Sequence, residues 1–287
     1  MESELPTATD ITVLMTVYHR ANPEAFAQAL ESVFAQQLPA QEIVLVADGL
    51  LTQELDDVIA RATERCQSPE TPKFTVLRRT RNQGAGLAAA AGLAAVRTGW
   101  IARLDADDIA EPDRFAKQWQ AIVEADQAGQ PVDVVGSALA EFTSADEDHI
   151  TGIRRLPETH EEIARYALIN SPVNHPSVML RTAAIKRVGG YRHFPYLEDY
   201  DLWLRLLADG GRFYNAPEAL TRFRTDGMLQ RRKAPGITKS EWRLQRLMVQ
   251  LGLVSWPRAV ANFLVRSAYR MLPTRVLQNT YRRLFIR

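Results

Sequence analysis

Ile11-Thr-Val-Leu-Met-Thr-Val17 is a short apolar run rich in β-branched residues, and a helix-like pattern over Pro23–Gln37 follows it. The same pairing recurs three times: Glu42–Ala47 with Leu51–Arg65, Phe74–Arg78 with Leu87–Arg97, and Trp100–Leu104 with Pro112–Ala128. Strands that alternate with helices in this way usually pair in parallel, with helices on both faces of the sheet. The sequence therefore predicts an α/β fold, Rossmann-like, with a mostly parallel sheet.

Polar and glycine residues follow each of these four strands. In open α/β sheets, ligands bind at the carboxyl ends of the strands. We therefore expect a ligand site among four segments: Tyr18-His-Arg20, Asp48-Gly49, Arg81-Asn82-Gln83-Gly84 and Asp105-Ala-Asp-Asp108.

The regular alternation stops after Pro131–Gly136, where we expect α+β structure that extends the same sheet. The features expected there are a helix over Glu158–Leu168, a turn at Gly189-Gly-Tyr191 and a helix over Leu197–Ala208. Beyond residue 230, helices are expected at about 238–251, 258–272 and 273–284.

Three carboxylates lie within four positions in Asp105-Ala-Asp107-Asp108. Like charges this close repel one another unless a cation is present. Mg²⁺ or Mn²⁺ takes oxygen ligands, often one or two carboxylates plus substrate phosphates. One interpretation is therefore a metal that bridges the protein to a diphosphate. The alternative is that Asp107 or Asp108 caps the helix expected from Pro112.

A second acidic cluster, Glu198-Asp199-Tyr-Asp201, begins the helix expected over Leu197–Ala208. A carboxylate held rigidly at a helix start can act as general base when a hydroxyl lies within hydrogen-bond reach. Alternatively, Glu198 and Asp201 only meet the positive end of the helix. Trp203, at helical spacing among apolar residues, is expected in the core.

Three further positions have two interpretations each. Asp48 could accept a hydrogen bond from a nucleobase or ribose, or form a turn with Gly49. The loop over Arg81–Gly86 has small residues that let the backbone approach a ligand, and it also resembles a Gly-x-Gly dinucleotide loop. His175 could contact an acceptor or a phosphate, or be a satisfied structural histidine.

Charge is divided unevenly along the 287 residues. Residues 231–287 hold 13 of the 35 Lys and Arg residues and one of the 34 acids, Glu241, which leaves 22 cations and 33 acids in residues 1–230. The tail is thus near +12 and the body near −11. We therefore expect an anionic partner for the tail, a membrane surface rather than a nucleic acid.

The cysteine count and the hydropathy of the sequence exclude certain kinds of site and a membrane span. Cys66 is the only cysteine, which excludes an internal disulfide and a Cys-based zinc site. The start of the chain is acidic, and no segment offers ~20 uninterrupted apolar residues. The expectation is a cytoplasmic protein that does not span a membrane.

The helix expected at 258–272 has an apolar side and a cationic side. The apolar side holds Val260, Phe263, Leu264 and Met271, and Arg258, Arg266 and Arg270 lie away from it. This pattern is typical of an interfacial helix and predicts peripheral binding to the inner face of an anionic membrane. The alternative is that the apolar side packs on the body and the arginines form a solvated rim or pair with acids.

Five motifs in a fixed order carry a resemblance to a known family. They are Val13–Tyr18 with Leu30–Gln36, Glu42–Gly49, Asn82-Gln-Gly84, Asp105–Asp108 with Pro112-Asp-Arg114, and Gly189-Gly-Tyr191 with Glu198–Trp203. Over residues 10–225 the chain thereby resembles family 2 glycosyltransferases of the GT-A fold. It looks closest to bacterial enzymes that assemble exopolysaccharide or lipopolysaccharide repeat units, the amylovoran-type transferases among them.

The resemblance implies a division of the chain and a reaction. Residues 1–230 would form the catalytic domain, with a nucleotide-binding half over 10–136 and an acceptor-binding half over 137–230, and residues 231–287 a basic amphipathic helical tail. The implied reaction is inverting transfer of a sugar from a nucleotide diphosphate to an acceptor hydroxyl. UDP is the preferred nucleotide, with dTDP and GDP open, and a lipid-linked saccharide is the expected acceptor.

The resemblance also implies roles for single residues. Asp199 is the implied general base, and Asp107, assisted by Asp105, is the implied ligand of Mn²⁺ or Mg²⁺. The residues implied in binding the nucleotide sugar are Tyr18, Asp48, Asn82, Gly84 and Asp105. The candidates for contact with acceptor or phosphate are His175, Glu198, Arg231 and Arg232. The chain departs from the family at Tyr18-His19-Arg20, where many members have Tyr-Asn-x-Glu.

Three other classes of protein fit parts of the sequence. An NAD(P)-binding Rossmann oxidoreductase fits Gly84-x-Gly86, but this loop follows the third strand and not the first, and the acidic clusters stay unexplained. A nucleotidyltransferase also uses carboxylate-bound metal, but no Gly-rich basic loop follows the first strand to hold a triphosphate. A non-catalytic, membrane-associated scaffold does not account for the intact Asp107 and Asp199.

Overall fold

The computed structural model describes residues 10–226 and 236–271. Arg231, Arg232 and the helix expected at 273–284 lie outside the described residues. Among the helices that are described, none combines the length and the apolar character needed to cross a bilayer.

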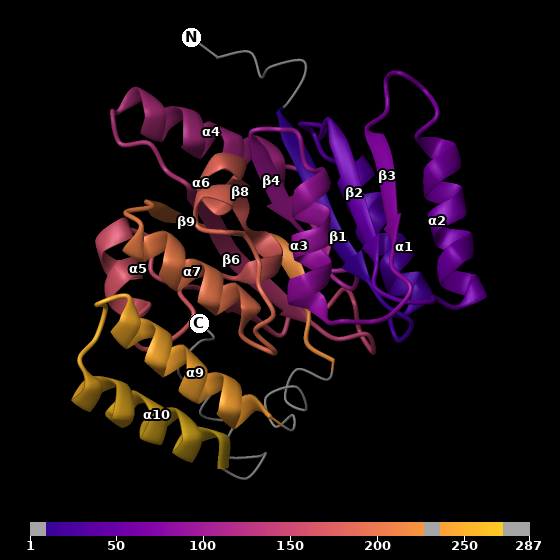
Figure 1. The fold of residues 1–287 in the computed structure, drawn as a ribbon. Helices are drawn as coiled ribbons and strands as arrows, with labels where there is room; N and C mark the ends of the chain where they lie inside the picture. The colour runs from indigo at the N-terminus through magenta and orange to yellow at the C-terminus, as the bar shows by residue number, and fades with distance from the viewer. Residues whose placement is uncertain (1–9, 227–235, 272–287) are drawn as a thin grey trace.

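The first half of the chain alternates strands and helices, as its sequence predicts (Figure 1). The elements are β1 (Ile11–Val17), α1 (Pro23–Phe34), β2 (Glu42–Ala47), α2 (Gln53–Arg65), β3 (Lys73–Arg78), α3 (Ala85–Ala95), β4 (Trp100–Arg103), β5 (Ile109–Ala110) and α4 (Arg114–Gln127). Local chemistry sets the helix starts. The Asn22 side chain, for example, accepts hydrogen bonds from the backbone N–H groups of Glu24 and Ala25, and Pro23 suits the first helical position.

Strands β1 to β4 form the parallel half of one sheet. Their order is β3-β2-β1-β4, and all three pairings are parallel. Val17 pairs with Ala47, and Ala47 with Arg78, so these strands end together. The loops that follow them therefore lie along one edge of the sheet, where open α/β sheets bind ligands.

The second half extends this sheet with strands of both directions. Its elements are β6 (Val134–Phe142), β7 (Gly152–Arg154), α5 (His160–Tyr166), a 3₁₀ turn (His175–Ser177), β8 (Met179–Arg181), α6 (Thr182–Arg187), α7 (Glu198–Ala208) and β9 (Phe213–Arg224). The full order is β3-β2-β1-β4-β8-β6-β9-β5, with β7 beside β6. β8 is antiparallel to β4 and β6, whereas β9 is parallel to β6. The parallel arrangement is thus confirmed for the first half, and the second half is mixed.

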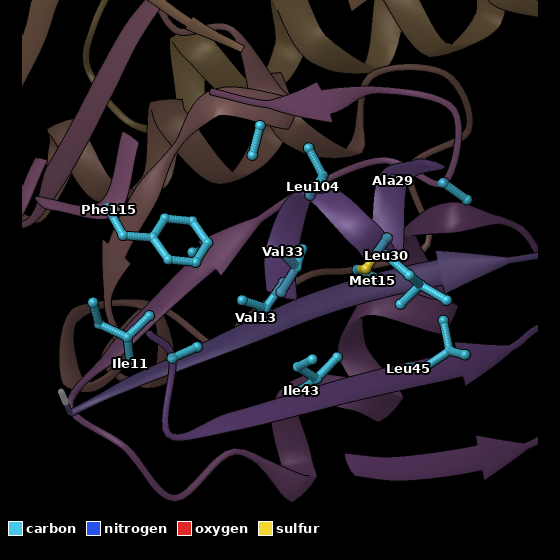
Figure 2. Close-up of a cluster of buried hydrophobic side chains, with 14 of the residues drawn as sticks. Ile11, Val13, Met15, Ala29, Leu30, Val33, Ile43, Leu45, Leu104 and Phe115 are labelled. Carbon is cyan, nitrogen blue, oxygen red and sulfur yellow. The ribbon is translucent and has the colours of Figure 1, made fainter. Parts of the chain in front are cut away.

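Helices cover both faces of the sheet, as predicted. Val13 and Met15 of β1 face a core that Leu30 of α1 and Phe115 of α4 help to fill (Figure 2). Leu14, between them, faces the opposite core, which α3, α6 and α7 cover. A strand buried on both faces is apolar at most of its positions, which explains the nearly continuous apolar runs in the sequence.

Helix α3 approaches its neighbours closely because small residues make up most of it. A side chain at Gly92 would come within 2.3 Å of Leu14 in the sheet. A side chain at Gly86 would come within 2.5 Å of the Arg192 carbonyl oxygen and 3.0 Å of Glu198 Cβ. Gly92 therefore lets α3 lie close to the sheet, and Gly86 lets the start of α3 lie directly against the start of α7.

Two helices of the basic tail lie on the side of α7, α9 next to it and α10 beyond α9 (Figure 1). They are α9 (Ile237–Gln250) and α10 (Trp256–Met271). Leu244 and Met248 of α9 share a buried cluster with Tyr200 and Leu204 of α7. Helix α9 is therefore part of the hydrophobic core of the body, and α10 packs on α9.

The surroundings of α10 agree only in part with either prediction for this helix, binding to a membrane surface or packing of its apolar side on the body. Glu241 of α9 is fully buried, and its two carboxylate oxygens lie 2.6 Å from Arg266 and from Arg270. A buried carboxylate needs positive charge beside it, so these two arginines hold α10 on α9. They are therefore not available to bind an anionic surface. Val260 and Leu264 are 42% and 60% exposed, so the expectation that the apolar side of the tail packs on the body is wrong for α10, whereas it is confirmed for α9.

Candidate functional site

The predicted nucleotide-sugar residues come together at one edge of the sheet. Tyr18 and Asp48 directly follow β1 and β2, and Asp105 lies just beyond β4. Asn82 and Gly84 lie in the loop between β3 and α3. Tyr18, Asn82 and Gly84 are exposed, Asp105 is half-buried and Asp48 is buried. The edge therefore offers both accessible groups and one fixed carboxylate.

Asp48 holds the loop between β3 and α3 in place. Its carboxylate accepts hydrogen bonds from the N–H groups of Gln83 and Gly84, at 3.1 and 2.8 Å, and lies 3.3 Å from the Arg79 guanidinium. Gly49, at φ +96°, turns the chain, and a side chain there would lie 2.8 Å from a nitrogen of the same loop. The turn at Asp48-Gly49 is thus confirmed, and the nucleoside contact of Asp48 stays a prediction.

The carboxylates of Asp105–Asp108 have different surroundings. Helix α4 begins at Arg114, so the expectation that Asp107 or Asp108 caps it is wrong. Asp108 is fully buried and accepts a 2.9 Å hydrogen bond from the Arg224 N–H. Burial lowers the pKa of Arg114 to about 9, and the charge of Asp108 opposes this shift. Asp108 is therefore a structural partner of buried arginine.

Asp105 and Asp107 are the half-exposed carboxylates of this segment. Asp105 Oδ1 lies 3.3 Å from a nitrogen of the buried Arg103. The Asp107 carbonyl oxygen accepts a 3.0 Å hydrogen bond from Arg224 Nε, which fixes the backbone. Within residues 10–226 and 236–271, no three His, Cys, Asp or Glu side chains form a group suited to a metal ion. A metal held here would therefore need further ligands from a substrate, as Mg²⁺ commonly takes from phosphates.

Glu198 and Asp199 occupy the first turn of α7. Burial raises the pKa of Glu198 to about 7, and the charges of Asp199 and Asp105 add to the shift. Burial likewise raises the pKa of Asp199 to about 6, again with a contribution from Asp105. Because the charge of Asp105 raises the pKa of both carboxylates, Asp105, beyond β4, lies near the start of α7.

Asp199 is better placed than Glu198 to stay ionised. Hydrogen bonds from its own N–H, from the Tyr200 N–H and from the Ser171 hydroxyl lower its pKa against the effect of burial. The first N–H groups of a helix have no partner within the helix, so they are available to a carboxylate. At neutral pH, Asp199 is therefore mainly charged, whereas Glu198 is about half protonated.

Asp201, the third acid of this turn, has a structural role. It is fully buried and pairs with Arg205, at 2.7 Å, and with Arg192. Two guanidinium groups thus compensate one buried carboxylate, which explains Asp201 better than the helix dipole alone. Trp203 is fully buried, which confirms its predicted place in the core.

His175 and Tyr191 form a pair beside the site. His175 Nε2 lies 3.1 Å from the Tyr191 hydroxyl. Burial lowers the pKa of His175 to about 4, and the Arg103 charge adds to this shift. The imidazole is therefore neutral at neutral pH and does not bind a phosphate as a cation. This favours the structural interpretation of His175, and its contact with an acceptor stays a prediction.

Three side chains of the site were not among the predicted residues: Arg103, Ser171 and Tyr191. Arg103 carries a charge within an otherwise apolar strand, a signal that the sequence offers. Tyr191 lies in a motif that the sequence marks as a turn and as part of the family resemblance, without a role for its side chain. Ser171 has no local pattern around it, and only the folded chain brings it to Asp199.

Comparison with known proteins shows the family of the chain. The family model described as glycosyl transferase family 2 matches residues 12–189. The amylovoran biosynthesis glycosyltransferase AmsE of Erwinia amylovora is 34% identical over 271 residues, which are 94% of this chain and 97% of that protein. A UDP-Gal:α-D-GlcNAc-diphosphoundecaprenol β-1,3-galactosyltransferase of Escherichia coli is 29% identical over 92% of each chain.

A solved structure supports the fold. The mannosyltransferase PcManGT from Pyrobaculum calidifontis, in complex with GDP-Man and Mn²⁺, superposes with a TM-score of 0.60 at 15% identity, over 96% of this chain and 80% of that chain. The oxidoreductase, nucleotidyltransferase and non-catalytic scaffold do not fit these matches. The chain belongs to glycosyl transferase family 2 and is a glycosyltransferase with the GT-A fold.

Proposed function

We propose that this enzyme transfers a sugar, with inversion, from a UDP-sugar to a hydroxyl of a lipid-linked saccharide during synthesis of a cell-surface polysaccharide. The observation that carries the proposal is that Asp105, beyond β4, lies near enough to Asp199, at the start of α7, for its charge to help raise the pKa of Asp199. A charged base there lies beside the sheet edge that binds ligands in this class of fold. The relative named for a diphosphoundecaprenol-linked acceptor supports the choice of acceptor.

The donor is proposed to lie along the strand ends. Tyr18, Asp48, Asn82, Gly84 and Asp105 would surround the nucleotide sugar there. UDP is preferred because the Escherichia coli relative, 29% identical over 92% of this chain, is named for UDP-Gal. GDP is the main alternative, since PcManGT shares the fold and its structure contains GDP-Man.

Asp107, assisted by Asp105, is proposed to hold Mn²⁺ or Mg²⁺. Both carboxylates are half-exposed beyond one strand end, and oxygen ligands suit these ions. Such an ion, when bound with the donor diphosphate, neutralises the charge that develops on the leaving group. The presence of Mn²⁺ in the PcManGT complex supports this assignment.

Asp199 is proposed to activate the acceptor. Its carboxylate takes the proton of the acceptor hydroxyl while the hydroxyl oxygen bonds to the anomeric carbon of the sugar. The bond from that carbon to the diphosphate breaks, and its electron pair leaves with the nucleotide diphosphate. One displacement from the opposite side inverts the anomeric centre.

A screen of nucleotide sugars tests the proposed reaction. With Mn²⁺ present, we expect the protein to release UDP from at least one UDP-sugar faster than it hydrolyses GDP- or dTDP-sugars. With an acceptor, NMR should show a glycoside of inverted anomeric configuration. Release of pyrophosphate, retention of configuration, or thermal stabilisation by NAD in place of UDP would contradict the proposal.

The α9–α10 hairpin is proposed to hold the enzyme on the inner face of the cell membrane, where a lipid-linked acceptor lies. Val260, Leu264, Val265 and Met271 of α10 are exposed, and Trp242 and Trp256 add rings suited to the headgroup level. Arg266 and Arg270 are occupied by Glu241, so the apolar surface, together with other cations of residues 231–287, would carry the binding.

Vesicle sedimentation tests this contact. We expect the full chain to pellet with anionic vesicles, and Leu264→Glu to reduce the pelleted fraction because it places a charge on the inserted surface. Ile150→Glu, an equal change at an exposed residue outside the hairpin, is the matched control. Point variants suit this test because α9 covers Tyr200 and Leu204, which a truncated chain would expose. Equal pelleting of both variants would contradict the assignment.

A further inference from the structure

A basic pocket lies between α9 and the segment that leads into α7. Its volume is about 360 Å³, and its lining includes Arg192, His193, Phe194, Arg243, Arg246 and Gln250. Three of these side chains are guanidinium groups, and none of the described residues that line the pocket is acidic. We call it the arginine pocket.

Arg192 keeps positive charge at the pocket although it has an acidic partner. Its Nε lies 3.1 Å from Asp201 Oδ2, which fixes the side chain. Asp201 also pairs with Arg205, at 2.7 Å, so the three groups together carry one net positive charge. Arg192 is 46% exposed at its side chain, whereas Asp201 is fully buried. The charge is therefore presented on the pocket side.

Arg243 and Arg246 add two further charges from α9. Arg243 is oriented by Phe194, whose ring centroid lies 4.6 Å away, and by the His193 carbonyl oxygen, at 3.4 Å. Neither arginine forms an ion pair with a described carboxylate. Three residues apart on a helix, their like charges repel each other. The helix dipole does not explain them, because it favours cations in the last turn, where α9 has none. A bound anion would remove this repulsion.

The arginine pocket lies near the proposed site of transfer. A side chain at Gly86 would touch both the Arg192 carbonyl oxygen and Glu198 Cβ, so the two ends of segment 192–198 lie against the same point of α3. This segment lines the pocket at its start and leads into the turn that carries Asp199. Only the short segment 192–198 therefore separates a ligand in the pocket from the proposed base, Asp199.

The arginine pocket also adjoins exposed aromatic surface. Trp242 and Arg246 are four residues apart on α9 and therefore share one face of the helix. Trp242 packs against Trp256 and Phe263 of α10, with ring centroids 6.3 and 5.3 Å apart. A ligand that carries both a phosphate and a hydrocarbon chain fits the boundary between the arginine pocket and this aromatic surface. A free nucleotide would contact only the arginine pocket.

We propose that the arginine pocket binds the phosphate or diphosphate group that joins the acceptor saccharide to its lipid. The inference rests on the proposed function and adds a binding site to it. Guanidinium groups suit this ligand because their planar N–H pairs match phosphate oxygens. The bound phosphate anchors the lipid toward Trp242 and directs the saccharide along segment 192–198 to Asp199.

Farnesyl diphosphate is the probe for this site, because it carries a diphosphate on a short polyprenyl chain. Isothermal titration compares the full wild-type chain with Arg243→Gln/Arg246→Gln and with Arg61→Gln/Arg97→Gln, a control with the same loss of charge at exposed arginines outside the pocket. We expect the pocket variant to bind at least about tenfold more weakly than wild type, since charge-assisted hydrogen bonds are lost. The control variant should bind as wild type does.

Further ligands distinguish the sources of phosphate. UDP with Mn²⁺ and vesicles of phosphatidylglycerol are titrated against the same three proteins, and farnesol and inorganic diphosphate separate the contributions of chain and charge. Equal binding of farnesyl diphosphate by the pocket variant and wild type would overturn the proposal. Loss of UDP binding in the pocket variant would also overturn it, because the arginines would then bind the donor. Loss of vesicle binding alone would overturn it as well, because the arginines would then bind lipid headgroups.

Fold and function are checked separately. Circular dichroism and Tm show whether the pocket variant is folded, and if it is not, Arg243→Lys/Arg246→Lys takes its place, with the charge kept and the planar hydrogen-bond pairs lost. Weaker binding by this second variant supports the site, and unchanged binding overturns it. The titrations need no turnover, so a wild-type protein that hydrolyses no nucleotide sugar would refute the proposed function alone.

Discussion

Asp199→Asn is expected to lower turnover by ~10²–10⁴-fold and to leave binding of the donor intact. The amide keeps the shape of the side chain at the start of α7, but it cannot take the proton of the acceptor hydroxyl. Initial rates at saturating donor measure the loss, and titration with UDP and Mn²⁺ measures donor binding in the same variant.

Glu198→Gln is the matched control, since it makes the same chemical change in the neighbouring residue. A smaller loss is expected, because Glu198 is about half protonated near neutral pH and is the weaker candidate for a charged base. Equal losses at the two positions, or loss of UDP binding in Asp199→Asn, would move the role of base to another residue.

The raised pKa of Asp199 adds a dependence on pH. A base must be ionised, so turnover should rise with pH through about 6. Stability should change in the opposite direction, because a carboxyl whose folded pKa lies above its ordinary value holds its proton more tightly when folded. This stabilisation is complete below about pH 4 and is lost as the pH rises through about 6. Asp199→Asn should therefore gain in Tm relative to wild type at pH 8 and not at pH 4.

Asp107→Ala is expected to reduce transfer by ~10³-fold or more while the protein stays folded. Its half-exposed carboxylate is the proposed ligand of the metal that neutralises the leaving diphosphate. The free energy of unfolding should change by about 1 kcal/mol or less, as is usual outside the core. Activity assays with Mn²⁺ and with EDTA, combined with denaturant unfolding, measure both effects. Full activity in EDTA would refute the metal assignment.

Asp108→Ala, one position further, should have its main effect on stability. Asp108 is fully buried near Arg114, and its removal leaves a buried guanidinium without that charge. The expected loss in the free energy of unfolding is roughly 3–5 kcal/mol. If Asp107→Ala unfolds the protein and Asp108→Ala does not, the roles given to these two neighbours are reversed.

The sequence by itself determined the order of the elements in the first half of the chain and the edge that carries the candidate site. Strand and helix periods are local properties, and so are helix starts such as Asn22-Pro23. Continuous apolar strands between helical segments leave few arrangements other than a helix-covered parallel sheet. Once β1 to β4 are parallel neighbours, Asp48 and Asp105 must follow strands that end on the same side.

Only the tertiary structure decided which charged residues are available for chemistry. Asp107 and Asp108 are adjacent and alike in sequence, but only Asp108 is buried, where it accepts a hydrogen bond from the N–H of Arg224, 116 residues further along the chain. Arg266 and Arg243 are both tail cations, yet Glu241 occupies Arg266, whereas Arg243 lines a pocket. The physical reason is that burial and pairing depend on residues brought together by folding, whereas a local pattern records only the period and the charge of its own segment.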